Sequence, residues 1–172
     1  MKILLAIPPL TQLNTAFPST AQLLGFLRSQ DIDAAQCDLS IELIEALFTK
    51  SMLGEIFETA SQGKLTKSQR IIQQQSAFYC RNIEPVMRFL SGRDASMALR
   101  YSDLNFWPAS KRKPTDEDLE WAFGTIGNHD RAIHLCTLFL KDIVDFIQQT
   151  IDPQFELIRY AELLCVRLHE FP

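Results

Sequence analysis

The hydrophobic pattern of this 172-residue chain changes once, near residue 39, and the change limits the folds open to it. Before residue 39 the sequence predicts two short strands with one helix between them, and after it the apolar spacing is that of helices. Two parallel strands make a poor sheet, because two-stranded structures are marginally stable and parallel sheets need cover on both faces. We expect further strands of this sheet to lie on polypeptide beyond this chain; the alternative is that helices wrap a minimal sheet.

The first 39 residues carry the signals of a βαβ unit. Residues 3–7 form an Ile- and Leu-rich run that predicts a buried strand, and Pro8-Pro9 ends it because proline cannot donate to a strand ladder. A helix with Ser19 or Thr20 as its cap is expected next, and residues 32–39 predict the second strand. Such units join parallel strands through a right-handed crossover.

The rest of the chain is predicted to be helical. Ser40 and Asp130 are expected to cap helices. Thr115, followed by Asp118, resembles a capping box. Pro85 predicts a kink or a split in a long helix, because it removes a donor and clashes with the preceding turn. The expected helices cover residues 41–48, 51–60, 67–91, 94–101, 115–123, 131–150 and 155–168.

Composition and charge exclude several classes of protein. The chain is 47% hydrophobic, which is ample for a core and too apolar for a disordered segment. Its 17 basic and 21 acidic residues argue against a general nucleic-acid binder, which carries a positive excess. No apolar run approaches the ~20 residues that span a bilayer, and the apolar start is too short for the core of a signal peptide. We therefore expect a cytoplasmic protein without a membrane or nucleic-acid partner.

The cysteines and histidines do not form a metal-binding pattern. The cysteines are too widely spaced to preorganise a zinc or iron–sulfur site, and their apolar neighbours predict buried free thiols. His129 and His134 lack the i, i+4 spacing of a helical metal pair, and with His169 they are expected to be surface or hydrogen-bonded residues. The four cysteines are Cys37, Cys80, Cys136 and Cys165.

The loop after the first strand is the candidate binding site. Ligands of open α/β sheets bind at the carboxyl ends of strands, where Gln12, Asn14 and Thr15 are expected to lie beside a helix N-terminus. These side chains could hold an anion or an amide-rich cofactor, or only satisfy the turn and cap the helix. Asp38 ends the second strand at the same edge, either as a ligand-binding carboxylate or as a charge that favours the next helix N-terminus. Only Gly25 falls inside the unit, so a Gly-rich phosphate loop is not expected.

Three weaker signals lie in the helical part. Lys111-Arg112-Lys113 is a basic tripeptide, but three charges supply little affinity for nucleic acid at cellular salt. Trp107 is expected to pack on a helix rather than to offer a stacking platform. The apolar face of residues 131–150 is either ordinary core or a surface for a partner.

Three stretches of the chain resemble one family. The first is residues 2–20, KILLAIPPLTQLNTAFPST, in which Pro-Pro is followed by Gln, Asn and Pro at unusual offsets. The second comprises Gly25-Phe26-Leu27 and residues 36–42, QCDLSIE, and the third is residues 152–162, DPQFELIRYAE. Together they resemble the N-terminal part of B12 (cobalamin)-binding-domain radical SAM proteins.

The resemblance implies a Rossmann-like cobalamin-binding domain placed before a partial TIM barrel. In that family the barrel holds a four-iron cluster on a Cys-x3-Cys-x2-Cys motif, and the cluster cleaves S-adenosylmethionine to a radical. Many members are methyltransferases that pass a methyl group through cobalamin to an unactivated carbon. The cofactor-binding residues that the resemblance implies here are Pro8, Pro9, Gln12, Asn14, Thr15 and Asp38.

Two motifs found in related proteins are absent from this sequence. It contains no Cys-x3-Cys-x2-Cys, so we expect the chain alone to perform no radical chemistry. It also lacks Asp-x-His-x-x-Gly, which supplies a histidine to cobalt in other B12 proteins, since His129-Asp130 does not match it. One βαβ edge is less than a corrin ring needs, and we therefore expect the isolated chain to bind cobalamin weakly or not at all.

We predict an α/β fold in which residues 1–39 are the βαβ start of a Rossmann-like domain of the cobalamin-binding type. Residues 40–172 are predicted to form a mostly α-helical region, either part of the same domain or an insertion in it. The predicted function is the N-terminal portion of a radical SAM enzyme, with a second copy or the remainder of that enzyme as its partner. The alternative is a non-catalytic helical interaction module that dimerises or docks on a partner.

Overall fold

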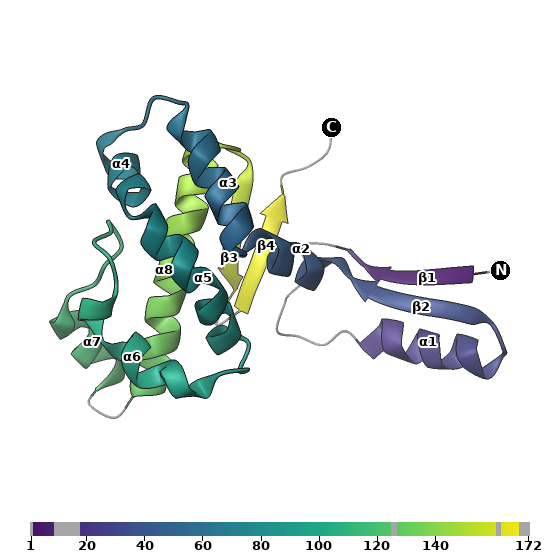
Figure 1. Ribbon diagram of the computed structural model, residues 1–172. Coiled ribbons are helices and arrows are strands. Elements are labelled where there is room, and N and C mark those ends of the chain that lie inside the picture. The colour runs from purple at the N-terminus through teal and green to yellow at the C-terminus, as the bar shows by residue number, and fades with distance from the viewer. Residues whose placement is uncertain (1, 9–17, 125–126, 161–162, 169–172) are drawn as a thin grey trace. The chain divides into compact units, whose positions relative to one another are not determined.

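The computed structural model describes residues 2–8, 18–124, 127–160 and 163–168, and from residue 156 onward only their backbone (Figure 1). The chain divides into two compact units. The first unit comprises Met1–Leu47 together with Gln154–Pro172, and the helical unit comprises Phe48–Pro153. The division therefore falls after Leu47, eight residues beyond the predicted change of pattern, and the last segment of the chain groups with the first.

The first unit begins with the predicted βαβ arrangement. Strand β1 (Lys2–Ile7) and strand β2 (Asp33–Asp38) are parallel neighbours, and helix α1 (Pro18–Ser29) connects them in sequence and lies against both (Figure 1). The turn after α1 is tight because Asp31 adopts a left-handed conformation, with φ of 56°, and Ile32 N donates to the Leu27 carbonyl. The prediction of an α/β fold with a parallel strand pair is confirmed.

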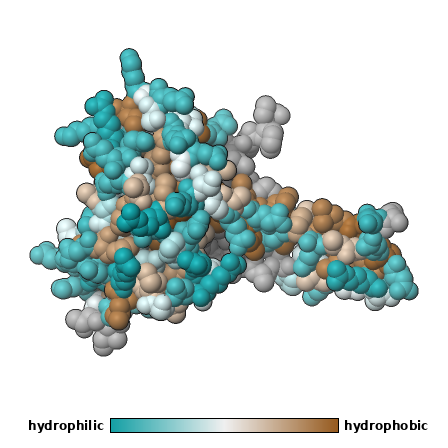
Figure 2. Space-filling model, viewed as in Figure 1, coloured by the Kyte–Doolittle hydropathy of each residue, from teal (hydrophilic) through white to brown (hydrophobic). Residues whose placement is uncertain are grey.

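The prediction that the first strand is buried is wrong. Exposed and half-buried residues alternate along β1, and the Leu4 side chain is 64% exposed. Over Pro18–Ser29 no residue of α1 is buried, and Phe26 is 62% exposed. Figure 2 shows brown, hydrophobic atoms on the surface of the part formed by β1 and α1. Every second residue of β1 is exposed, so one face of this strand is left open.

Helix α2 (Leu39–Leu47) follows β2 without a loop. Its cap is Asp38 rather than the predicted Ser40, because Asp38 accepts hydrogen bonds from the first backbone N–H groups of the helix. Ser40 lies inside the helix and is buried. The prediction missed the cap by two residues because Asp38 was assigned to the strand, and it is both the last residue of β2 and the cap of α2.

The helical unit is built around one long helix. The elements are α3 (Lys50–Ser61), α4 (Lys67–Gln74), α5 (Ser76–Leu90), η1 (Ala95–Met97), α6 (Ala98–Ser102), η2 (Leu104–Phe106), α7 (Asp116–Phe123) and α8 (Asn128–Thr150). Helix α8 runs the length of the unit, and α4, α5, α6 and α7 all contact it (Figure 1). Its buried residues extend beyond one stripe, from Ala132 to Ile147, because helices cover it from several sides. This confirms that the apolar face of residues 131–150 is core.

Two predicted helix boundaries in this unit are wrong. The long helix splits at Gln75, between α4 and α5, whereas Pro85 lies inside α5 beside buried Ile83 and Val86. Packing of that apolar face outweighs the hydrogen bond that proline removes. Helix α8 begins at Asn128, with Gly127 at the cap position, so Asp130 lies in the first turn instead of capping the helix.

Aromatic side chains fill the core of the helical unit. Tyr79 stacks on Phe139, with ring centroids 4.9 Å apart, and Phe57 packs on Phe146 at 5.0 Å. Trp107 is buried and its indole Nε1 donates to the Tyr101 carbonyl at 2.8 Å. The prediction that Trp107 packs rather than offers a stacking platform is confirmed.

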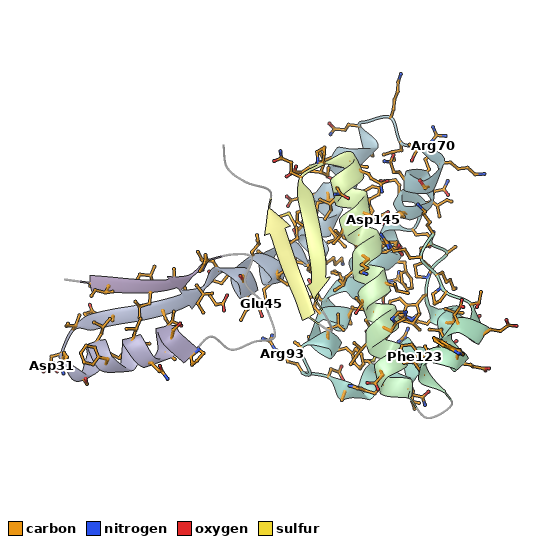
Figure 3. All side chains as sticks on the ribbon, turned by 180° about the vertical axis from the view of Figure 1, so that it is seen from behind. Asp31, Glu45, Arg70, Arg93, Phe123 and Asp145 are labelled. Carbon is orange, nitrogen blue, oxygen red and sulfur yellow. The ribbon has the colours of Figure 1, made fainter. Side chains whose placement is uncertain are left out.

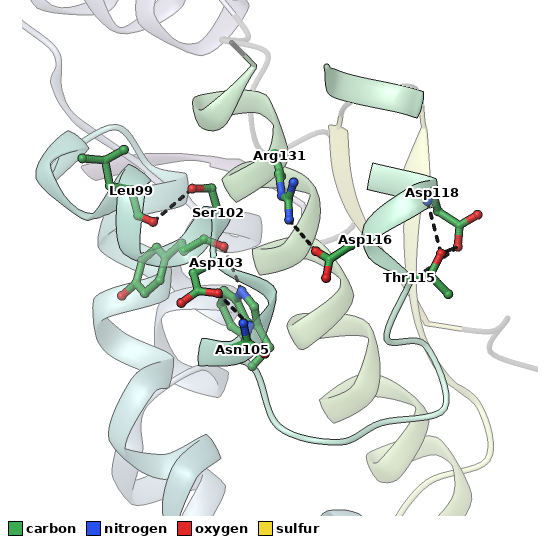
Figure 4. Close-up of polar contacts among 10 residues, drawn as sticks. Leu99, Ser102, Asp103, Asn105, Thr115, Asp116, Asp118 and Arg131 are labelled. Carbon is green, nitrogen blue, oxygen red and sulfur yellow. Dashed lines mark hydrogen bonds and ion pairs between the residues drawn. The ribbon is translucent and has the colours of Figure 1, made fainter. Parts of the chain in front are cut away.

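The predicted capping box at Thr115 is confirmed. Thr115 Oγ1 accepts from Asp118 N, and Asp118 Oδ2 accepts from Thr115 N at 3.1 Å and from Thr115 Oγ1 at 2.6 Å (Figure 4). These bonds lower the pKa of the exposed Asp118 carboxyl. Arg131 of α8 pairs with Asp116 Oδ1 at 3.0 Å and ties the start of α7 to α8.

The predicted helix over residues 155–168 is wrong. Strands β3 (Phe155–Tyr160) and β4 (Leu163–Leu168) pair antiparallel instead. The pairing sets Phe155 opposite Leu168 and Leu157 opposite Val166. Leu164, Val166 and Leu168 recur at every second position of β4, as Phe155 and Leu157 do at the start of β3, and this period-two pattern wins over the helical one that the same short segment also fits.

Candidate functional site

The carboxyl ends of β1 and β2 form the predicted site. In the parallel register Ile7 is the partner of Asp38, so the two strands end at the same level. Pro8 therefore leaves β1 at the edge where Asp38 ends β2. This is the edge at which open parallel sheets bind ligands.

Asp38 caps α2 at this edge. Its Oδ1 accepts from Ser40 N at 3.0 Å and from Ile41 N at 3.1 Å. Of the two roles that the sequence left open for Asp38, the structure shows the helix-capping one. Both bonds use the same oxygen, and the residue is only half-buried, so the capping role leaves part of the carboxylate facing outward.

Ser40 also lies at this edge, although the sequence did not indicate it as a site residue. Its Oγ donates to the Pro8 carbonyl at 2.9 Å, which fastens the start of the loop to the first turn of α2. The bond joins residues 32 positions apart, so local sequence patterns do not reveal it. A small hydroxyl residue two positions after a strand-ending aspartate is the one signal that could have suggested it.

The other predicted site residues are Pro9, Gln12, Asn14 and Thr15, and all four lie outside the described residues. Of the predicted set, the structure brings together Pro8 and Asp38. The described part of the edge thus offers the Asp38 carboxylate and the Pro8 carbonyl, which already accepts a hydrogen bond from Ser40. Those groups fit the rim of a ligand site, and they do not by themselves enclose a group as large as a corrin.

The buried ionisable groups of the described chain lie in the helical unit. Burial raises the pKa of Asp142, and hydrogen bonds from Ser110 and Tyr79 offset part of that rise. Burial, with the adjacent Asp142, raises the pKa of Tyr79 above its usual range. Tyr79 Oη donates to Asp142 Oδ2 at 3.3 Å. The sequence analysis missed this pair, although Asp142 lies three positions after Phe139 and four before Phe146, on the apolar face of α8, which is a visible signal.

The cysteines that the structure describes are free thiols. Cys136 is buried, and burial raises its pKa, so its thiolate form is disfavoured. Cys37 and Cys80 are half-buried. The side chain of Cys165 lies outside the described residues. Within the described part of the chain no three His, Cys, Asp or Glu side chains are grouped to hold a metal ion.

The basic tripeptide makes contacts within the helical unit. Arg112 donates from Nε and Nη2 to Asp145 Oδ2, at 2.9 and 2.6 Å. Lys113 Nζ donates to the Trp107 carbonyl at 2.9 Å. These bonds hold the loop after Trp107 against the rest of the unit, so two of the three charges have structural roles.

Comparisons with protein-family models, with curated proteins and with solved structures give no match. Among the described residues, no helix combines the length and the apolar character that a membrane span requires. The class defined by the fold is an α/β chain with a parallel strand pair and a separate helical unit.

Proposed function

We propose that this chain is the N-terminal portion of the cobalamin-binding domain of a cytoplasmic, methyltransferase-like radical SAM enzyme. The observation that carries the proposal is the register of β1 and β2, in which Ile7 is opposite Asp38. That register brings the start of the Pro8 loop and the end of β2 to one edge, as a Rossmann-like domain requires. The resemblance in sequence supplies the identity of the cofactor.

Exposed apolar side chains on the first unit support the same proposal. Leu4 of β1 and Leu23 and Phe26 of α1 are all at least half exposed. Parallel sheets normally have both faces covered, and exposed apolar surface of this kind marks a contact with other polypeptide. In the proposed enzyme, the remaining strands and helices of the domain would cover these side chains.

The chain is not catalytic by itself under this proposal. It has no Cys-x3-Cys-x2-Cys motif, so the cluster and the S-adenosylmethionine chemistry belong to the remainder of the enzyme. Pro8 and Pro9 would shape the loop, while Gln12, Asn14 and Thr15 with Asp38 would face the cobalamin. Binding by this chain alone is expected to be weak or absent.

The test uses the gene from which the chain comes. The reading frame is expected to continue past Pro172 into a Cys-x3-Cys-x2-Cys motif, and the full-length protein is expected to shift the visible spectrum of hydroxocobalamin. Gln12→Ala in that protein should weaken binding, whereas Gln30→Ala should not, because Gln30 is exposed in the turn before β2 at the opposite end of the strand. A frame without the motif, or equal binding by both variants, would contradict the proposal.

A second function has one observation in its favour. Trp121 on α7 is 91% exposed, and Leu99 on α6 is also largely exposed, although both residues are large and apolar. Such side chains suit a helical interaction module that dimerises or docks on a partner. Size-exclusion chromatography with and without cobalamin separates the two functions: a dimer that Trp121→Ser abolishes, together with no cobalamin binding by the full-length protein, would favour the module.

A further inference from the structure

A cavity of about 310 Å³ opens in the helical unit, beside α8. Helix α4 forms one wall, the loop after Trp107 forms a second and α8 forms the third. Figure 3 shows Asp145, one of its lining residues, on α8. Its lining residues include Gln69 and Ile72 of α4 and Asp142, Asp145, Phe146 and Gln149 of α8. A volume of this size is at the lower end of the range for small-molecule sites.

The cavity presents both hydrogen-bond acceptors and donors, and Lys111, an exposed cation, is among its lining residues. Asp142, Asp145 and Gln149 present carboxylate and amide oxygens. The amide of Gln69 is already engaged, since its Oε1 accepts from Thr66 N at 2.7 Å and its Nε2 points toward the Gln149 carbonyl at 3.4 Å. Asp142 is the buried acid of this lining, and a ligand that contacts it brings a donor.

Asp142 makes no ion pair among the described residues, although the nearby charge of Arg112 favours its ionised form and the exposed Lys111 lines the same cavity. The Asp142 side chain is buried, with the residue only 5% exposed, and Tyr79 supplies a neutral hydroxyl donor at 3.3 Å. The nearby Arg112 donates from Nε and Nη2 to Asp145 Oδ2. A buried carboxylate without a paired cation is costly, and a bound cation would remove much of that cost.

Apolar side chains lie beside this acid. Ile72 of α4 and the buried Phe146 of α8 line the same cavity. Phe146 follows Asp142 by four positions on α8, so the two residues are neighbours on one face of the helix. The site therefore combines a carboxylate with an aliphatic and an aromatic side chain in one cavity.

We propose that this cavity binds a small primary alkylammonium ion, with the ammonium group against Asp142 and the alkyl chain against Ile72 and Phe146. The three N–H donors of such an ion match the acceptors of Asp142, Asp145 and Gln149. A small carboxylate or phosphate would meet two acids and the already paired Arg112, and the cation left to attract it is Lys111, whose side chain is exposed. The proposal is independent of the function proposed for the first unit, because every lining residue lies in Phe48–Pro153.

Calorimetric titration of the chain with n-butylammonium tests the site. Binding is expected, while n-butanol and butyrate, which have the same chain and no ammonium group, are expected not to bind detectably. Affinity should fall about fourfold for each methylene removed, from butyl to propyl to ethyl, because each buried methylene contributes a fixed increment. Equal affinity for n-butanol, or no dependence on chain length, would overturn the proposal.

A matched pair of variants on α8 locates the ammonium group. Asp142→Asn keeps the shape of the side chain and should weaken n-butylammonium binding about tenfold or more, the expected loss of a charge-assisted hydrogen bond. Asp130→Asn makes the same change at an exposed position in the first turn of α8 and should bind as the unmodified chain does. If both variants bind as tightly as the unmodified chain, the ammonium group is not at Asp142. Circular dichroism confirms that each variant is folded.

The pH dependence gives a readout that needs no variant. The groups around Asp142 are Tyr79 of α5, Ser110 and Arg112 of the loop, and Asp145 on the same helix, and Lys111 of the loop lines the same cavity. Because burial raises the pKa of Asp142, its protonation should weaken n-butylammonium binding at a higher pH than an exposed aspartate would. Affinity that stays constant down to the ordinary range of aspartate pKa values would count against Asp142 as the binding group.

Discussion

The βαβ segment and the helical unit place their apolar residues differently. Along α1 no residue of Pro18–Ser29 is buried, and Leu4 of the adjacent strand is mostly exposed. In α8, by contrast, residues are buried from Ala132 to Ile147, and several of them are completely inaccessible. Both segments are hydrophobic in sequence, so the difference lies in what covers them.

This difference indicates which of the two units has an independent hydrophobic core. The helical unit buries aromatic and aliphatic side chains against one another and has the contacts of an independent core. The strand pair of the first unit has an open face, and two-stranded sheets have little stability of their own. We therefore expect the helical unit, which buries more of its apolar side chains, to be the more stable of the two.

The largest expected effect comes from truncating a leucine in the helical core. Leu140 of α8 is completely buried, so Leu140→Ala should lower the free energy of unfolding by about 2–5 kcal/mol, from lost transfer energy and the cavity left behind. Both tryptophans of the chain, Trp107 and Trp121, lie in this unit, and their fluorescence during urea unfolding reports on it. The matched variant Leu23→Ala on α1 removes a half-exposed leucine and should change stability by less than about 0.5 kcal/mol. Because the first unit contains neither tryptophan, its unfolding is followed by circular dichroism. Equal losses would show that the first unit has a core of its own.

Hydrogen exchange compares the two units directly. Backbone amides of α8 are expected to exchange only when the helical unit opens as a whole, whereas those of β1 and β2 should exchange through local opening. A difference of about 3 kcal/mol between these openings corresponds to ~100-fold slower exchange in α8. Mass spectrometry of peptides that cover Asp33–Asp38 and Asn128–Thr150 measures it. Similar protection in both peptides would contradict the comparison.

The parts of the fold that the sequence predicts correctly are those set by local chemistry. Residues 3–7 are a short β-favouring run ended by Pro8-Pro9, and residues 32–39 were predicted as a strand because they follow the helix of a βαβ pattern; the structure contains both strands. The capping box at Thr115 requires only two residues three positions apart, and it too is present. The hairpin at Phe155–Leu168 was predicted as a helix because its apolar spacing fits both periods, and pairing with a second strand decided the outcome.

The candidate sites depend on contacts that the sequence does not contain. Asp38 was identified as an edge residue because it ends a strand, but its bond to Ser40 and the bond from Ser40 to Pro8 emerge only when the edge forms. Tyr79 and Asp142 are 63 positions apart and meet because α5 packs against α8. No spacing rule links residues so distant, so the cavity beside Asp142 is visible only in the structure.

A smaller effect is expected when the donor to Asp142 is removed. Tyr79→Phe keeps the ring that stacks on Phe139 and deletes only the hydroxyl that donates to Asp142. The buried carboxyl then loses a partner, and the helical unit should lose about 1–3 kcal/mol of stability. Tryptophan fluorescence during urea unfolding measures the loss. The double variant with Asp142→Asn should lose less than the sum of the two single changes, and strict additivity would show that the two groups do not interact.

The smallest effects should come from helix caps, and here the two units are expected to agree. Asp38 caps α2 of the first unit, and Thr115 caps α7 of the helical unit. Because a cap satisfies backbone groups of its own helix, its removal should cost about 1 kcal/mol whether or not a core lies beneath it. Asp38→Ala and Thr115→Ala should each speed hydrogen exchange in the first turn of their own helix about fivefold. Thr59→Ala, at an exposed position inside α3 where threonine caps nothing, is the control and should leave exchange unchanged. A loss that spreads from Asp38 through β1 and β2 would instead mean that the cap holds the whole strand edge together, because Ser40 also anchors Pro8 there.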